Sequence, residues 1–410
     1  MIRKMRVRNY KSLRDVEVPL QSPTVIFGPN AAGKSNLFDA IGLLARLVTR
    51  RNLKEAFEGH RGLPLEAIHY SAGSLPDLQS TPQHSMVFSV DVELSDVVVQ
   101  EVESRIRDLR KGIDDDTPSQ QTSKVVHRNL RYEVELEISS QSGQLRVVNE
   151  RLAALRQDGN ERASRNPFIE KTGSRLSLRM EGQAHPTMHE LGLDYTIAST
   201  ALYPPHYPHI TAFREEMSRC HFYYFEPREL MRAGNAIADV GNVGPRGEEL
   251  AAFYYTLSLR NKPQFQAIKL AAKQLLPRLR DLDIEKTDKA ELFLRIVEGE
   301  ASYSNRLISE GTLRVLGLLA VLSPTTGATT IGYEEPENGV HPRRLRLIAE
   351  LIRNASARER QILVNTHSPS FPPILRTTSF SSVGNAGPTR SLFPSLITGR
   401  CSVIRRSRLT

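Results

Sequence analysis

The stretch Gly28-Pro29-Asn30-Ala31-Ala32-Gly33-Lys34-Ser35 decides the fold, because it matches the Gly-x-x-x-x-Gly-Lys-Ser/Thr pattern of a phosphate-binding loop. It follows the apolar run Thr24–Phe27, which predicts a strand, and it precedes apolar residues at helical spacing over residues 37–47. In such a unit, loop N–H groups and the helix N-terminus surround a phosphate group. A plain glycine-rich turn has no use for a Lys-Ser pair, so we expect Lys34 to bridge phosphates and Ser35 to ligate Mg²⁺.

A phosphate loop by itself fits a small-molecule kinase, a GTPase, a helicase or an ABC-type ATPase equally well. The apolar run Thr330–Tyr333, a predicted strand, leads into two adjacent acids, Glu334 and Glu335. At the carboxyl end of a strand, one carboxylate can hold Mg²⁺ while the next activates the attacking water. Taken alone, the pair fits a charged strand-to-turn transition just as well.

Two further stations lie near these acids in the sequence. Ser309 and Gly311 come just before a predicted helix, where a hydroxyl and free N–H groups can bind a γ-phosphate, although Ser309 can equally be a simple helix N-cap. His367 follows the predicted strand at 361–365, where it can hydrogen-bond a γ-phosphate. A lone histidine is more often an ordinary surface or core residue.

Together these stations resemble the ABC-type ATPases of the AAA family, in the branch of chromosome-maintenance, recombination-repair and overcoming-lysogenization-defect-like proteins. The resemblance covers roughly residues 1–95 and 220–370, and it rests on the order of the motifs. That order is an opening at 7–13, a phosphate loop that continues to Asn36, a long insertion, a signature at 307–314, the acids 334–338 and the switch histidine within Thr366-His367-Ser368-Pro369. A kinase would leave the signature and the histidine unexplained.

The resemblance implies a role for each station. ATP would be bound by the loop from Gly28 to Asn36, which includes Pro29, Asn30, Ala31, Ala32, Gly33 and Lys34, and Mg²⁺ by Ser35 and Glu334. Glu335 would polarise the attacking water and His367 would contact the γ-phosphate. Ser309 and Gly311 would act in trans, on the nucleotide of a second copy in a head-to-tail homodimer. DNA or an effector protein would be a further partner, in DNA repair or phage defence.

Three features depart from the family pattern. Glu334 stands where this superfamily usually has Asp, which favours an alternative function as an ATP-binding interaction module with little or no hydrolysis. Only rough position suggests Gln79 or Gln83 as the Q-loop glutamine. The tail after Ser370 contains no acidic residue and is unlike a family ending; one hypothesis is a truncation or a shifted reading frame, which resequencing the locus would test.

The order of predicted strands and helices favours an α/β fold, a P-loop NTPase of the ABC-ATPase head type. We expect a mixed sheet with helices on both faces and an inserted α+β region. The predicted parts are an N-terminal ATPase lobe (1–95), the insertion (96–220), a C-terminal ATPase lobe (221–370) and a poorly ordered basic tail (371–410).

Composition excludes several classes of protein. The 410 residues are 39% hydrophobic, with no apolar run long enough to span a bilayer and no signal-peptide core, so we expect a cytoplasmic protein without membrane contact. Cys220 and Cys401 are too few for a disulfide framework. The net charge is +9, but seven arginines from position 360 onward carry most of it, which weakens the argument for nucleic-acid binding. Residues 203–209 are interpreted as a surface loop, although two histidines there could bind a metal.

Overall fold

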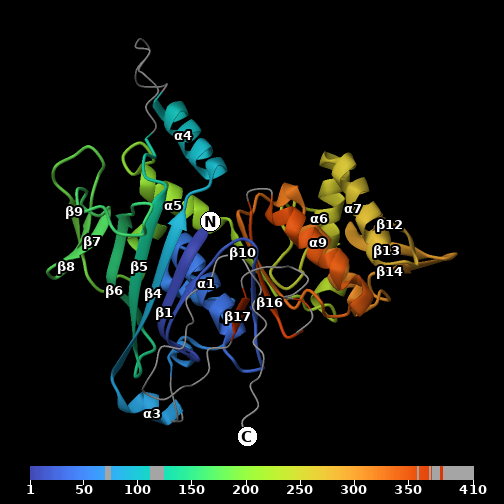
Figure 1. The fold of residues 1–410 in the computed structure, drawn as a ribbon, viewed down its shortest axis with the longest axis horizontal. Coiled ribbons are helices and arrows are strands. Elements are labelled where there is room, and N and C mark those ends of the chain that lie inside the picture. The colour runs from blue at the N-terminus through green and yellow to red at the C-terminus, as the bar shows by residue number, and fades with distance from the viewer. Residues whose placement is uncertain (70–74, 111–123, 358–359, 369–370, 372–378, 382–410) are drawn as a thin grey trace, which may run out of the picture.

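The computed structural model describes the chain except for residues 70–74, 111–123, 358–359, 369–370, 372–378 and 382–410. The predicted tail therefore lies almost entirely outside the described residues. Two lobes flank a central region in which β10, β16 and β17 lie (Figure 1). The described strands form three sheets.

The first sheet is antiparallel throughout and has eight strands. In spatial order these are β2 (Leu13–Pro19), β1 (Ile2–Tyr10), β4 (Gln83–Glu93), β5 (Asn129–Ser139), β6 (Leu145–Ala154), β7 (Ile169–Thr172), β8 (Arg175–Leu178) and β9 (Thr187–Glu190). The region at 96–220 thus adds five strands to a sheet that β1, β2 and β4 begin.

The second sheet is parallel and brings distant parts of the chain together. Its order is β10 (Cys220–Tyr223), β15 (Thr330–Glu334), β16 (Gln361–Thr366), β3 (Thr24–Phe27) and β17 (Ser379–Ser381). Because all strands run in one direction, the phosphate loop after β3 and the polar residues after β15 and β16 emerge at the same edge. The Gln361 amide also hydrogen-bonds the N–H and C=O of Ile2 in β1, at 2.8 and 2.6 Å, and so ties the first two sheets together.

A third, antiparallel sheet lies in the other lobe, where β13 (Glu291–Glu298) pairs with β11 (Asn235–Ala236), β12 (Leu279–Lys286) and β14 (Ala301–Ser304). The described helices are α1 (Lys34–Thr49), α2 (Leu53–Phe57), α3 (Leu75–Ser80), α4 (Asp96–Arg110), α5 (Pro208–Ser218), α6 (Leu250–Arg260), α7 (Lys262–Leu275), α8 (Glu310–Val321) and α9 (Leu345–Ser356). Short 3₁₀ turns are η1 (Pro64–Ala67), η2 (Ile197–Ser199), η3 (Leu230–Arg232), η4 (Pro324–Thr326) and η5 (Pro342–Arg344).

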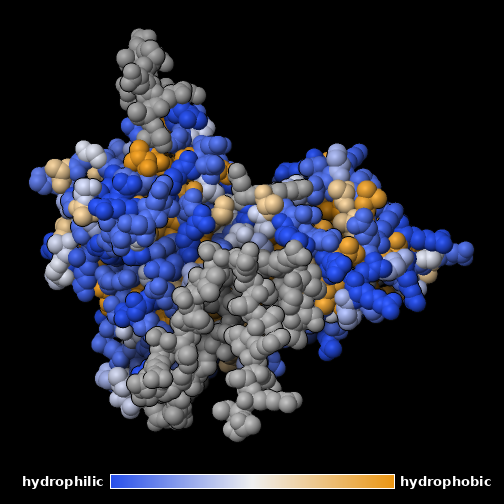
Figure 2. Space-filling view, viewed as in Figure 1, coloured by the Kyte–Doolittle hydropathy of each residue, from blue (hydrophilic) through white to orange (hydrophobic). Residues whose placement is uncertain are grey.

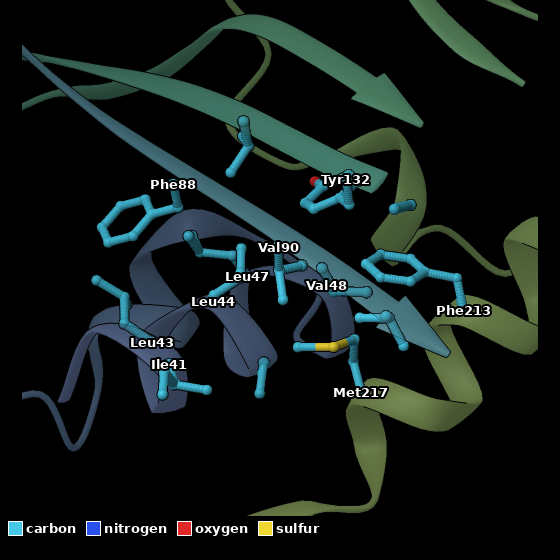
Figure 3. Packing of buried hydrophobic residues seen from close by; sticks show 14 of the residues in the cluster. Ile41, Leu43, Leu44, Leu47, Val48, Phe88, Val90, Tyr132, Phe213 and Met217 are labelled. Atoms are coloured by element: carbon cyan, nitrogen blue, oxygen red, sulfur yellow. The ribbon is translucent and has the colours of Figure 1, made fainter. Parts of the chain in front are cut away.

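Two hydrophobic cores cover the two faces of the parallel sheet. Ile26 and Leu363 belong to the core that contains α1, α5 and the antiparallel sheet, whereas Val25 and Val364 belong to the core that contains α6 to α9. Alternate residues of one strand point to opposite faces, so a sheet with helices on both sides needs apolar residues at every position. Figure 3 shows Leu44 and Leu47 of α1 beneath β4 and β5. In the space-filling view the surface of both lobes is mostly hydrophilic (Figure 2).

The expected α/β fold with helices on both faces is confirmed. The parallel and antiparallel strands occupy separate sheets. The interpretation of 203–209 as a surface loop is wrong for His209, which is fully buried in the first turn of α5 and bonded to Glu181. Among the described residues, no group of three His, Cys, Asp or Glu could hold a metal ion, and no helix is long and apolar enough to cross a membrane.

Candidate functional site

The phosphate loop has the backbone that a phosphate site needs. Gly28, Ala31 and Gly33 have positive φ angles of 156°, 61° and 86°. A Cβ on Gly33 would come within 2.8 Å of the Ser12 hydroxyl oxygen, so this position also requires glycine for space. Gly33 is the N-cap of α1 and supplies no capping side chain, which leaves the positive helix end open to an anion.

Lys34 is enclosed by the loop that it belongs to. Its ammonium group donates hydrogen bonds to the carbonyl oxygens of Gly28 (2.9 Å) and Pro29 (2.7 Å) and lies 3.2 Å from Nδ1 of His367. Only 6% of Lys34 is exposed, and burial lowers its pKa, while the charges of Glu335 and Glu334 oppose that shift. A phosphate entering here would meet a cation whose present partners are weaker acceptors than phosphate oxygens.

Ser35 and Glu334 meet although they are 299 positions apart in the sequence. The Ser35 hydroxyl donates to Oε2 of Glu334 at 2.9 Å, and the Asn365 amide nitrogen donates to the Ser35 hydroxyl at 3.2 Å. Glu334 and Asn365 are register partners in β15 and β16, which explains why both reach Ser35. The side chain of Glu334 therefore reaches Ser35 from the position where the superfamily usually has Asp.

Arg61 lies on the other carboxylate oxygen of Glu334. Its guanidinium donates to Oε1 at 3.1 Å, approaches Asp39 at 3.7 Å and stacks over the ring of Tyr224. Burial raises the pKa of Glu334, and the nearby Arg61 charge and the Ser35 hydroxyl oppose this shift. Sequence reasoning missed Arg61, because only the folded chain brings this loop residue to the acid pair.

The side chains of Glu335 and His367 face each other at the pocket lined by the phosphate loop. Oε1 of Glu335 lies 3.0 Å from Nε2 of His367, and the Asn338 amide donates to Oε2. Glu335 itself has a φ of 53°, a left-handed conformation that costs a non-glycine residue about 1–2 kcal/mol. Its N–H donates to the Asn365 carbonyl oxygen at 2.7 Å, which holds the strained backbone in place.

These side chains border one pocket of about 680 Å³, a size typical of ligand sites. The predicted site residues that line it are Asn30, Ala31, Ala32, Gly33, Lys34, Ser35, Asn36, Glu335 and His367, and Ser12 joins them. Gly28 and Pro29 contribute carbonyl groups to Lys34, and Glu334 lies behind Ser35. The exposed Gln79 and Gln83 are not among the lining residues.

Ser309 and Gly311 do not line this pocket. The Ser309 hydroxyl accepts the N–H of Thr312 at 3.2 Å and so caps α8, in agreement with the plainer of its two interpretations. Gly311 packs backbone to backbone on Gly339, since an added Cβ would come within 2.2 Å of the Gly339 carbonyl oxygen. Glycine at 311 thus has a reason within the chain itself, whatever it does towards a second copy.

The donor atoms around Ser35 suit Mg²⁺, which prefers oxygen ligands. The Ser35 hydroxyl and the Glu334 carboxylate are in contact, and Oδ1 of the fully buried Asn365 has no hydrogen-bond partner among the described residues. A buried acceptor without a partner is uncommon and fits a site completed by a cation or its water. The residues present therefore fit the metal that the motif implies.

Comparison with known families agrees with this geometry. The model "AAA ATPase domain" matches residues 1–124, and the model "AAA domain, putative AbiEii toxin, Type IV TA system" matches residues 214–371. Together they cover both halves of the pocket, with the phosphate loop in the first match and Glu334, Glu335 and His367 in the second. Both matched parts of the chain are of the AAA ATPase family. The order of the motifs resembles that of the ABC-type branch with the SMC and RecF proteins.

Individual relatives are distant or match over short stretches. The chain is 41% identical to "DNA replication and repair protein RecF" from Synechococcus sp. (strain JA-2-3B'a(2-13)) over 51 residues, which are 12% of this chain and 13% of that protein. The SMC head bound to the C-winged helix domain of ScpA is 12% identical with a TM-score of 0.49, and the SMC head domain from Thermotoga maritima is 12% identical with a TM-score of 0.38. Each of these two matches covers 91% of both chains.

Proposed function

We propose that this ATPase binds ATP with Mg²⁺ in the pocket around Lys34 and hydrolyses it, as a nucleotide-driven switch. The observation that supports this most is the meeting of Ser35 with Glu334 beside the Lys34–His367–Glu335 cluster. A glycine-rich turn with a structural role would not assemble a cation, a hydroxyl, two carboxylates and an imidazole from both ends of the chain.

In this proposal each side chain has one task. Lys34 exchanges its carbonyl and imidazole contacts for phosphate oxygens, and the uncapped N-terminus of α1 holds the β-phosphate. Ser35 and Glu334, with Asn365, would hold Mg²⁺, which neutralises charge on the transferring phosphate. Glu335, freed from His367, accepts a proton from the attacking water, while His367 turns to the γ-phosphate.

We further propose a head-to-tail homodimer in which Ser309 and Gly311 act on the nucleotide of the other copy. The resemblance of residues 307–314 to the signature of ABC-type ATPases supports a role in trans. The uncapped remainder of the α8 N-terminus is a favourable place for a γ-phosphate from a second copy. In this arrangement ATP forms part of the interface, so hydrolysis releases the partner.

The process that hydrolysis would drive is DNA repair or phage defence. The match to a RecF protein favours DNA repair, and the toxin–antitoxin name of one family model favours defence. The insertion at 96–220 would carry the contact with DNA or an effector protein, while lobes 1–95 and 221–370 form the motor. DNA that raises the ATPase rate would support repair, and an effect of salt on that stimulation would show phosphate contacts.

A second candidate is an ATP-binding regulatory module with little hydrolysis. The Arg61–Glu334 ion pair favours it, because the guanidinium already neutralises the carboxylate that would hold the metal. Measurements of ATP binding, ATP hydrolysis and solution mass separate the two candidates.

The deciding experiment measures Mg²⁺-dependent ATP hydrolysis and solution mass for the wild type and for Glu335→Gln. Loss of the general base should lower the rate by about 10²–10⁴-fold and leave an ATP-bound dimer. A wild type that binds ATP without turnover would support the regulatory module instead. A wild type that neither binds nor hydrolyses ATP would contradict both candidates.

A further inference from the structure

Glu337 reaches from the turn after Glu335 to the loop that carries His367. Its Oε1 accepts the hydroxyl of Thr366 and the backbone N–H groups of His367 and Ser368, the latter two at 3.3 Å. Three donors of one short loop thus converge on one carboxylate oxygen of Glu337. Within the loop, the N–H of Ser368 also donates to the Thr366 hydroxyl oxygen at 3.0 Å. None of the motifs in the sequence assigns a task to this side chain.

The turn that presents Glu337 is itself held on both sides. At its start, the Glu335 N–H bonds the Asn365 carbonyl oxygen at 2.7 Å, and the Asn338 N–H closes the turn on the Glu335 carbonyl oxygen at 3.0 Å. At its end, Gly339, with a φ of 76°, packs against Gly311 at the start of α8. Glu337 is therefore offered to the histidine loop from a backbone with little freedom to move.

The hydrogen bonds of Glu337 indicate that this side chain orients the loop at 366–368 and does not only stabilise it. Its Oε2 is buried and has no hydrogen-bond partner among the described residues, while Oε1 takes all three donors. Backbone N–H bonds at 367 and 368 define the direction in which the chain leaves β16, and hence where the imidazole points. Nε2 of His367 then lies 3.0 Å from Glu335 and Nδ1 lies 3.2 Å from Lys34.

We propose that Glu337 is a positioning residue, which fixes the loop at 366–368 and thereby the place of His367 between Lys34 and Glu335. The proposal rests on the hydrolytic function proposed above. Because the task is to accept hydrogen bonds, an amide oxygen can replace the carboxylate oxygen, and because Oε2 has no bond to lose, exchanging it for NH₂ breaks no contact. Alanine at this position has no oxygen that could accept these hydrogen bonds.

The test compares Glu337→Ala with Glu337→Gln, and uses Glu350→Ala, on the exposed face of α9, as the matched control. For Glu337→Ala we expect kcat to fall about tenfold to hundredfold, since small displacements of reacting groups have effects of this size. The affinity for a fluorescent ATP analogue should stay within about twofold, because Lys34 and Ser35 are untouched, and Glu337→Gln should recover most of kcat. Glu350→Ala should behave as the wild type.

A second readout needs no nucleotide. Amide hydrogen exchange of a peptide that covers residues 362–368 should become faster in Glu337→Ala than in Glu337→Gln, while exchange in α1 stays the same. Wild-type kcat and wild-type exchange in Glu337→Ala would overturn the proposal. So would equal loss of kcat in the Ala and Gln variants, or joint loss of ATP affinity and thermal stability. If the wild type binds no ATP, the proposed function fails, and the exchange measurement still tests Glu337 separately.

Discussion

The role of Lys34 can be predicted from the sequence, whereas the contacts of its side chain cannot. We expect Lys34→Ala to weaken ATP binding by about 10–100-fold, the worth of one or two charge-assisted hydrogen bonds. Thermal stability should change little, because the variant loses the contacts of the ammonium group together with the cost of burying its charge. That cost is what lowers the pKa of Lys34. Calorimetric titration with ATP measures the effect. Lys54→Ala, on the exposed side of α2, is the control, and equal affinities in the two variants would contradict the prediction.

Glu150 is a buried acid far from the phosphate loop. It accepts the N–H groups of Ile197 and Ala198 at 2.6 and 2.9 Å and the Tyr132 hydroxyl at 3.0 Å. Burial raises its pKa from 4.5 to about 7, and the three donors oppose the shift. The folded state therefore holds the proton more tightly than the unfolded state, so Glu150 makes stability fall as pH rises from 4.5 to about 7, by about 3 kcal/mol.

The measurement for Glu150 is the difference in unfolding free energy between the wild type and Glu150→Gln across that pH window. A difference is needed because His60 and His127, whose pKa values burial lowers to about 4, make stability rise with pH between about 4 and 6.5. The variant should lack the contribution of Glu150, so its stability should increase relative to the wild type as pH rises to 7. Parallel curves would show that Glu150 does not titrate in this window.

At the scale of elements, the start of α8 has two roles that one substitution can separate. Ser309→Ala should lower stability by about 1 kcal/mol, because the N-cap bond to Thr312 is lost. Ser309→Asp should keep the cap and the stability, since Asp caps helices as well as Ser does. Its negative charge would however repel a γ-phosphate of a second copy, so ATP-dependent dimerisation should be lost. An Asp variant that dimerises normally would argue against a role of Ser309 in trans.

The Gly311–Gly339 contact limits what other substitutions at this element can show. A Cβ at either position would overlap backbone atoms of the other, so Gly311→Ala should destabilise the monomer by about 1–3 kcal/mol. We expect its melting temperature to fall in the absence of nucleotide. A loss of ATPase activity in that variant would thus report on folding as well as on the interface, whereas a wild-type melting temperature would mean that the turn after Glu335 can move aside.

At the scale of the whole molecule, a composite site predicts that two inactive variants restore each other. Lys34→Ala has an intact signature and Ser309→Asp has an intact phosphate loop, so a mixed head-to-tail dimer contains one complete site. Mixing the two should recover a substantial part of the hydrolysis rate that neither has alone, measured against total protein. Mixing Lys34→Ala with Glu335→Gln, both altered in the same half of the site, should recover nothing. Activity that stays absent in the first mixture would contradict the composite site.

Local sequence by itself determined the phosphate loop, because its glycines, lysine and serine act within one short strand–loop–helix unit. It also predicted β3, α1, α8, β15 and β16, since their apolar spacing matches their burial. The strand β6 and the helix α5 are among the elements that escaped prediction. Pro208 and buried His209 in the first turn of α5 look like loop residues until Glu181 satisfies the histidine.

Only the tertiary structure decided how the stations combine. The parallel pairing of β3, β15 and β16 brings Ser35, Glu334 and Asn365 into contact, and no local pattern encodes a pairing over some three hundred residues. The same holds for Arg61 on Glu334 and for Glu337 on the histidine loop, whose partners are set by packing rather than by spacing. Sequence specifies the chemistry of each group, because that depends on its side chain, whereas the distances between groups depend on the long-range contacts that only folding makes.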